Sequence, residues 1–304
     1  MADASSKSSG PLATHLSAGV EHRLQKLVKS LKDSYGERSV DTVHDLRVAS
    51  RRLRAFGVTF SDVLGQKTCS RLERKLKRVT RAVGALRDLD VLIALADQRR
   101  IGAASDLERA ALEHLLETLE ERRCVAATKA ETRLQELDTG ALCRLVRRAA
   151  RDVIAGLLPE DDQRAHARAL LERMIFDAAE QEPPQDGAEH AEQLHLLRIA
   201  IKEIRYALEF FEPVLGAHFG ILYARAEALQ ELLGTHHDLM VLGEIVAERG
   251  DELARRNRPA LAAGLQLTGA ALAADRRAVL ERFRGRGFDR DWWRKELQLA
   301  FERG

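Results

Sequence analysis

Apolar residues recur every three or four positions along almost the whole chain, and this spacing predicts α-helices. No segment alternates apolar and polar residues as a half-buried strand would. The sequence therefore predicts an all-α protein. We expect helices at roughly 12–34, 42–61, 68–84, 88–99, 105–137, 141–156, 161–180, 189–211, 217–233, 238–249, 255–284 and 290–302.

Residues that break or begin helices support the prediction of an all-α protein. The chain has only 6 prolines, and none lies between residues 12 and 158. Asp41 and Ser105 precede periodic segments and are expected to cap helices. Asp88 and Asp238 are expected at helix starts for the same reason. Several glycines are expected to separate helices, namely Gly36, Gly65, Gly102, Gly140, Gly234 and Gly250.

Composition narrows the class of protein. Of the 304 residues 45% are apolar, which is enough to build a large core and excludes wholesale disorder. The 3 cysteines are widely spaced and form neither a disulfide framework nor a metal motif, which fits a reducing cytoplasm. Residues 1–11 are Ser-rich and predict a disordered tail rather than a signal peptide. The longest uncharged run, 259–274, is too short to span a membrane, so we expect a cytoplasmic protein.

Two pairs of segments repeat at nearly the same offset. VHDLRVASRRLR at 43–54 aligns with LHLLRIAIKEIR at 194–205, and VGALRDLDVL at 83–92 aligns with LGTHHDLMVL at 233–242. Both pairs are about 150 residues apart, which predicts an internal duplication. We therefore expect two pseudo-symmetric antiparallel helical bundles. The expected division places the first bundle at 12–140, and a linker helix with the second bundle at 141–304.

The repeated segment carries a cationic row on one side of a helix. On a wheel of about 100° per residue, the row of the first copy spans an arc of about 80°, opposite the apolar residues Leu46, Leu53, Phe56 and Phe60. Arg52 and its counterpart Glu203 stand at an outward position that changes sign between the copies. The two rows are His44, Arg47, Arg51 and Arg54, and His195, Arg198, Lys202 and Arg205.

A single row of this kind is most often the solvated face of an amphipathic helix. Here, however, the row recurs in both copies, and like charges at neighbouring helical positions cost a few tenths of a kcal/mol each. Net charge is only +2 for the chain, but residues 41–90 hold 12 Lys or Arg and 6 Asp or Glu. An uncompensated row suggests that a ligand supplies the counter-charge.

The next predicted helix adds a further basic row, and the two helices could line a common groove. Its counterpart in the second copy keeps Arg225 but has Glu227 and Glu231, so we expect the first half to dominate binding. The basic row of the first half comprises Arg71, Arg74, Lys75, Arg78 and Arg81.

A repeated basic groove favours a long polyanion, because guanidinium groups fork onto phosphate oxygens and lysine supplies a mobile charge. Single-stranded nucleic acid is disfavoured, since aromatic residues are only 5% of the chain and base stacking needs them. No helix-turn-helix or zinc motif was found either. Inorganic polyphosphate needs only charge and is the expected partner. Neither a cofactor nor a metal is expected, and the oligomeric state is left open.

These motifs resemble the CHAD family, the "conserved histidine α-helical domain", over about residues 12–285. The resemblance implies two helical bundles that bind inorganic polyphosphate without catalysis, often at polyphosphate granules. Two positions depart from the pattern: Glu227 replaces an expected basic residue, and His237 stands opposite Arg87. The ligand contacts that the resemblance implies are His44, Arg47, Arg51, Arg52, Arg54, Lys77, Arg87, His195, Arg198, Lys202 and Arg205.

The sequence also admits other functions. The adjacent pairs His44-Asp45 and His237-Asp238 admit a helical HD-type metal-dependent phosphohydrolase. A scaffold that binds an acidic protein partner, or a nucleic-acid binder, would also use a basic groove. Metal-dependent phosphate release, salt-resistant binding and competition by RNA distinguish these alternatives.

Overall fold

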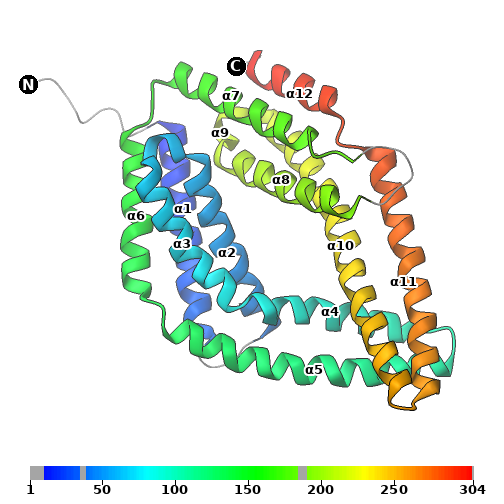
Figure 1. Cartoon of the computed structure of the whole chain (residues 1–304). Coiled ribbons are helices and arrows are strands. Elements are labelled where there is room, and N and C mark those ends of the chain that lie inside the picture. The colour runs from blue at the N-terminus through cyan, green and yellow to red at the C-terminus, as the bar shows by residue number, and fades with distance from the viewer. Residues whose placement is uncertain (1–9, 35–38, 184–189, 303–304) are drawn as a thin grey trace, which may run out of the picture. The chain divides into compact units, whose positions relative to one another are not determined.

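The computed structural model describes residues 10–34, 39–183 and 190–302, which contain helices and no strand, so the all-α prediction is confirmed. The predicted tail 1–11 lies outside this part except for Gly10, which precedes the first helix, and Pro11, which begins it; Gly36 also lies outside. The helices are α1 (Pro11–Asp33), α2 (Val40–Thr59), α3 (Ser61–Ala82), α4 (Gly84–Ile101), α5 (Asp106–Gln135), α6 (Thr139–Ala155), α7 (Glu160–Ala179), α8 (Ala191–Phe210), α9 (Glu212–Leu215), the 3-10 turn η1 (Gly216–His218), α10 (Phe219–Arg255), α11 (Pro259–Arg286) and α12 (Arg290–Glu302) (Figure 1).

Side-chain caps begin several of these helices. Ser105 accepts a hydrogen bond from the backbone N–H of Glu108 at 3.2 Å, which confirms it as the cap of α5. The prediction that Asp41 caps α2 was wrong. Ser39 holds that position and accepts from the N–H of Thr42, while Asp41 lies in the first turn, where its negative charge complements the helix dipole.

Gly140 was expected between helices but lies in the first turn of α6. Two other glycines expected between helices lie inside a single helix. Gly234 and Gly250 both belong to α10, which is continuous from Phe219 to Arg255. A mid-helix glycine costs only about 1 kcal/mol, and buried leucines on both sides of Gly234 outweigh that. Asp238 is therefore inside a helix rather than at its start. Asp88 is also not a cap, because α4 begins four residues earlier.

The helix break predicted at Gly65 is present as a kink within α3. Its φ of 70° is in the left-handed region that favours glycine, and it kinks α3 between Ser61 and Ala82.

The chain forms two compact units, each assembled from segments of both halves of the sequence. Unit 1 comprises Met1–Ala82, Arg133–Gln230 and Phe288–Gly304, and unit 2 comprises Val83–Thr132 and Glu231–Gly287. The internal duplication and the division at residue 140 stay predictions.

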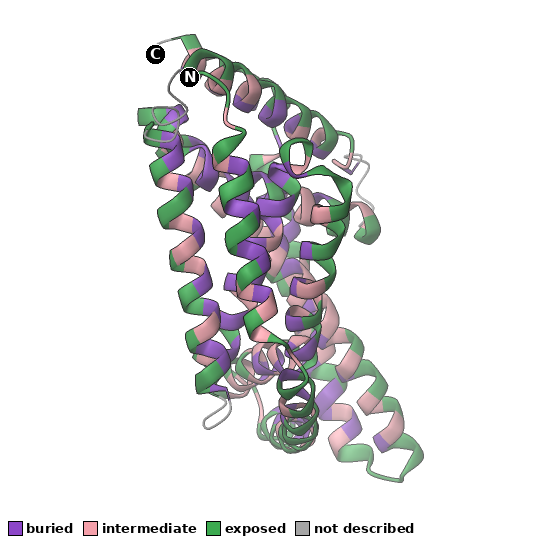
Figure 2. Ribbon diagram, turned by 90° about the vertical axis from the view of Figure 1, so that its left-hand side faces the viewer, coloured by how far each residue is buried: buried purple, intermediate pink, exposed green. Residues whose placement is uncertain are grey.

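Unit 1 buries one face of each of its helices, and buried and exposed positions alternate around individual helices in Figure 2. α1 packs against α2 and α6, α3 packs against α2 and α6, and α7 packs against α8 and α12. α2 also packs on α8, where Phe56, Phe60, Phe210 and Phe211 form a cluster with ring centroids 5.0 to 6.0 Å apart. This cluster holds together the two helices that carry the predicted cationic rows.

Unit 2 has its own core, built largely from leucines of α4, α5, α10 and α11. The motif residue Asp90 is buried in it and accepts a hydrogen bond from Arg123 Nε at 2.6 Å. This ion pair joins α4 to α5, so Asp90 has a structural role.

Within the described parts of the chain, no helix combines the length and apolarity needed to cross a bilayer.

α11 approaches α5 so closely at Gly264 that no Cβ fits there without a shift of the backbone. A Cβ at Gly264 of α11 would clash with the carbonyl oxygen of Leu107 and lie 2.5 Å from the Cβ of Ala111 on α5. Gly264→Ala should therefore lower the free energy of unfolding by about 1–3 kcal/mol, as overpacking does, despite the better helix propensity of alanine. Urea denaturation measures the change.

Gly243→Ala is the matched control, because nothing lies within 4 Å of a Cβ at Gly243 on α10. There the propensity gain is unopposed, and stability should rise by up to about 1 kcal/mol. Equal effects of the two substitutions would refute the close approach.

Candidate functional site

The predicted basic rows of α2 and α8 meet at a cavity of about 260 Å³ within unit 1. α2 contributes Arg51 and Arg54, and α8 contributes Lys202, so three predicted site residues line one space. They converge because the two helices pack through their aromatic ends, which turns these stretches of the two rows toward a shared space. The remaining lining residues are Ala55, Val58, Thr59, Met174, Ile199, Glu203 and Tyr206.

The lowered pKa of Lys202 reflects its burial and the positive charges around this cavity. Its pKa is lowered from 10.5 to about 8, mainly because burial penalises the ammonium, and further because Arg51, Arg198 and Arg54 repel it. Glu203 opposes this in part. Four cations from two helices are thus close enough to destabilise one another. An anion placed among them would relieve that repulsion.

Glu203 was expected to point outward; it is exposed in the structure, and it also lines the cavity. Partial burial of its carboxyl group raises its pKa, against the opposing effect of Lys202 and Arg54. Among the described residues that line the cavity, Arg51, Arg54 and Lys202 are cationic and Glu203 is the one carboxylate.

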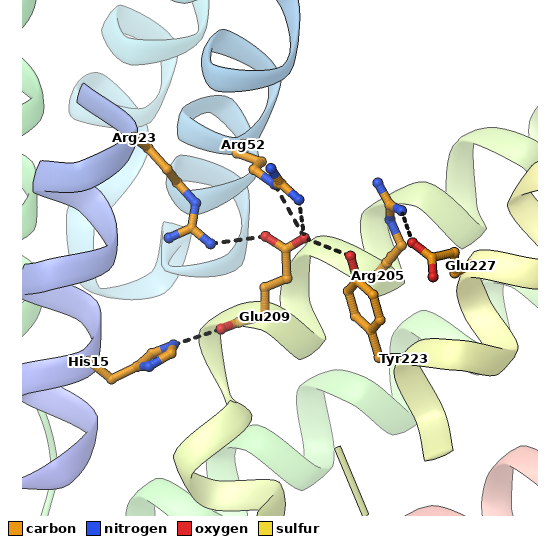
Figure 3. A network of polar contacts seen from close by, with 7 residues as sticks. All are labelled: His15, Arg23, Arg52, Arg205, Glu209, Tyr223 and Glu227. Carbon is orange, nitrogen blue, oxygen red and sulfur yellow. Dashed lines mark hydrogen bonds and ion pairs between the residues drawn. The ribbon is translucent and has the colours of Figure 1, made fainter. Parts of the chain in front are cut away.

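Arg52 departs from the expected outward position and contacts a buried carboxylate. Figure 3 shows Glu209 between Arg23 of α1 and Arg52 of α2, with donor–acceptor distances of 2.9 and 2.8 Å. Burial opposes the charge on Arg52, but its hydrogen bonds to Glu209, the charge of Glu209 and the nearby Tyr206 and Tyr223 together outweigh this and raise its pKa. Arg52 therefore helps to hold three helices together, and its contact with a ligand stays a prediction.

Arg205 is paired within the protein as well. Its Nη1 donates to Glu227 at 3.1 Å, and its guanidinium lies 5.5 Å from the ring centroid of Tyr223 (Figure 3). The same guanidinium lies 5.7 Å from the ring centroid of Tyr206. Glu227 is the position where a basic residue was expected, and it neutralises the last cation of the α8 row. A ligand contact for Arg205 also stays a prediction.

The basic row of α3 lies on the helix beside α2. Glu73 is shared at 3.7 Å by Arg54 and by Lys77, so one carboxylate faces two cations. Arg78 and Arg81 are exposed, and Lys75 is half-buried. α3 can therefore extend the cationic surface beyond the cavity.

Other predicted site residues are not among those that line the cavity. Arg87 lies on α4 in unit 2. Arg225 lies in unit 1 with its guanidinium 5.4 Å from the ring centroid of Trp292. His44 is exposed near the start of α2 and Arg47 is half-buried one turn later. His195 is exposed, but partial burial of its ring and the positive charges of Arg198 and Lys202 lower its pKa.

Four of the residues that sequence reasoning missed line the cavity with a side chain of distinct chemistry or form the network beside it. Met174 of α7 and Tyr206 of α8 line the cavity, and Arg23 and Glu209 form the ion-pair network beside it. A charged residue among the apolar positions at the end of α8 was the available signal for Glu209. Met174 and Arg23 come from helices far away in the sequence and left no local signal.

An HD-type phosphohydrolase would need a cluster of metal ligands among the described residues. Among them, no group of three or more His, Cys, Asp or Glu side chains is arranged to hold a metal ion. His236 is buried within α10, and His237 and Asp238 follow it inside the same helix.

The fold and this cavity define an all-α protein with a cationic site between packed helices. The CHAD domain profile matches residues 18–247, and the chain belongs to the CHAD domain family.

Solved structures share the fold. The CHAD domain from the plant Ricinus communis has 23% identity and a TM-score of 0.59, over 96% of this chain and 93% of that one. PptA from Streptomyces chartreusis has 18% identity and a TM-score of 0.58, over 95% and 99%. A comparison with curated proteins found no match.

Proposed function

We propose that this protein binds inorganic polyphosphate, without transforming it, at the cavity between α2 and α8. The observation that carries the proposal is the convergence of Arg51, Arg54 and Lys202 on one space with a single carboxylate, Glu203. Phosphate oxygens would accept forked hydrogen bonds from the arginines and a point contact from the lysine. Membership of the CHAD family supports the same ligand.

A linear phosphate polymer fits the site better than single-stranded nucleic acid does. The aromatic residue at the cavity, Tyr206, is only 4% exposed and has the guanidinium groups of Arg52 and Arg205 within 6 Å of its ring centroid. It is therefore not available to stack on a base. Beyond the cavity, the exposed cations Arg78 and Arg81 of α3 offer contacts to further phosphates of the same chain. Association with polyphosphate granules in the cytoplasm would follow from such contacts.

Polyphosphate affinity should fall steeply with salt, because each phosphate contact releases condensed counterions. Three contacts predict a slope of log K against log salt of about −2, and contacts along α3 make it steeper. Isothermal titration at several salt concentrations measures the slope. An affinity that does not change with salt would refute binding through these cations and favour an acidic protein partner.

The alternatives are tested in the same solutions. Single-stranded RNA of matched charge should compete poorly at matched salt, and stronger binding of RNA would assign the site to nucleic acid. Release of inorganic phosphate from polyphosphate, stimulated by a divalent metal, would replace the proposal with a phosphohydrolase.

A further inference from the structure

Lys202 differs chemically from the lysines on the protein surface. It is half-buried in the cavity, whereas Lys29, Lys129 and Lys295 are exposed on helix surfaces. With a pKa of about 8, half of the Lys202 side chains carry a neutral amine at pH 8. An ordinary lysine at that pH is only about 0.3% neutral. Lys202 therefore presents the reactive form of the amine more than about 100 times as often.

A neutral amine that remains open to solvent is a nucleophile, and burial beside other cations is one of the ways proteins activate lysine. The less basic amine is intrinsically less nucleophilic, by roughly tenfold if its reactivity follows a slope of about 0.4 per pK unit. The gain in neutral amine exceeds this loss. The net advantage of Lys202 over an exposed lysine is about tenfold at pH 8.

The groups around Lys202 select the electrophile. Arg51 and Arg54 of α2 and Arg198 of α8 surround it with positive charge, and Met174 of α7 is apolar. Glu203 is the one carboxylate among the described residues that line the cavity, and Glu73 of α3 lies 3.7 Å from Arg54. Such a site concentrates reagents that carry a phosphate group. It also stabilises phosphate as a leaving group, because negative charge develops on that group as it departs.

We propose that Lys202 is a site of Nε-acylation by acyl phosphates, the class of metabolite that joins an activated acyl carbon to a phosphate. The Nζ lone pair attacks the carbonyl carbon and a C–N bond forms. The bond from that carbon to the phosphate oxygen breaks, and inorganic phosphate leaves with the electron pair. The nitrogen loses one proton to water, so the step is a group transfer that needs no oxidant or reductant.

Acylation converts the ammonium of Lys202 into a neutral amide and removes one of the three cations of the cavity. Acylation would therefore weaken polyphosphate binding, and bound polyphosphate would shield Lys202 from acylation. These two consequences rest on the proposed function. The acylation itself does not, because it needs only the cavity and its charges.

The test is incubation of the full-length protein with acetyl phosphate between pH 6.5 and 9.5, followed by peptide mass spectrometry that quantifies acetylation at each lysine. Lys202 should react about tenfold faster than Lys29, Lys129 and Lys295 at pH 8. Its rate should level off above about pH 8, while theirs continues to rise. A Lys202 rate no greater than the exposed rates, or one that rises without levelling, would overturn the proposal.

A neutral acyl donor, N-acetoxysuccinimide, separates amine activation from phosphate recruitment. The ratio of the acetyl phosphate rate to the neutral-ester rate should be several-fold higher at Lys202 than at Lys29. Arg51→Gln should remove most of that excess, and the ratio cancels any change that this variant makes in the pKa of Lys202. An equal ratio at both lysines would overturn the assignment to acyl phosphates.

Polyphosphate titrations distinguish the two proposals. Acetylated wild-type protein should bind polyphosphate several-fold more weakly than untreated protein, whereas Lys202→Arg protein treated in the same way should not change. Rapid acetylation of Lys202 without any effect on a measured polyphosphate affinity would support the acylation and count against the proposed binding site.

Discussion

Replacing Arg51 and Arg54 together with glutamate is expected to weaken polyphosphate binding by at least about 100-fold. Both side chains line the cavity with Lys202, and hydrogen bonds to charged groups contribute about 1.5–3 kcal/mol each. Two such contacts account for about 3–6 kcal/mol, and the new carboxylates add repulsion toward phosphate. Titration at fixed salt measures the loss, with thermal unfolding to verify that the variant is folded.

Matched charge changes elsewhere make this result specific to the cavity. Arg255→Glu with Arg258→Glu removes the same total charge from exposed positions in unit 2, and should weaken binding only slightly. His44→Ala should also have a small effect, because His44 is exposed near the start of α2, outside the cavity lining. If either control weakened binding as much as the double reversal, the cavity would not be the binding site.

The fold class could be predicted from the sequence because helical periodicity and scarce prolines are local properties. The helix boundaries were less predictable. Gly234 and Gly250 are ordinary breaker signals, but burial of leucines along α10 outweighs the small cost of a glycine in a helix. The assembly of the compact units from discontinuous segments depends on packing between distant helices, which no local pattern records.

The candidate site could be predicted in part. The angular position of Arg51, Arg54 and Lys202 on their helices was readable from the sequence, and the packing of α2 on α8 brings them to one cavity. Which cations are neutralised was not readable. Arg205 and Glu209 are four residues apart on α8, a spacing that favours a local ion pair.

The structure contains neither that pair nor an outward Arg52. Glu209 instead contacts Arg23 and Arg52 from two other helices, and Arg205 contacts Glu227. Partner choice in a buried network depends on which side chains tertiary packing brings together. The basic rows are therefore partly structural: Arg52 of α2 and Arg205 of α8 pair with carboxylates of the protein. Arg51, Arg54 and Lys202 of the same rows line the cavity.

Glu209→Ala is expected to be the most destabilising substitution in this network, lowering the free energy of unfolding by about 3–5 kcal/mol. The carboxylate is 10% exposed and accepts hydrogen bonds from Arg23, Arg52 and Tyr223, while its backbone carbonyl accepts from His15 Nε2 at 2.8 Å (Figure 3). Removing it leaves two largely buried guanidinium groups without their partner, which costs far more than the net contribution of the intact pair. Urea denaturation at neutral pH measures the change.

Glu21→Ala is the control, because Glu21 pairs with Arg147 at 2.7 Å where both side chains are more than a third exposed. Solvent screens that pair, so its loss should cost less than about 1 kcal/mol. Similar losses for the two variants would show that Glu209 is not a structural centre. Glu209→Gln keeps the shape but not the charge, and its loss of stability should fall between those of the two variants.

A folded Glu209→Gln protein should also bind polyphosphate more weakly. Glu209 links α1 and α2 to α8, and the spacing between Arg51, Arg54 and Lys202 depends on that link.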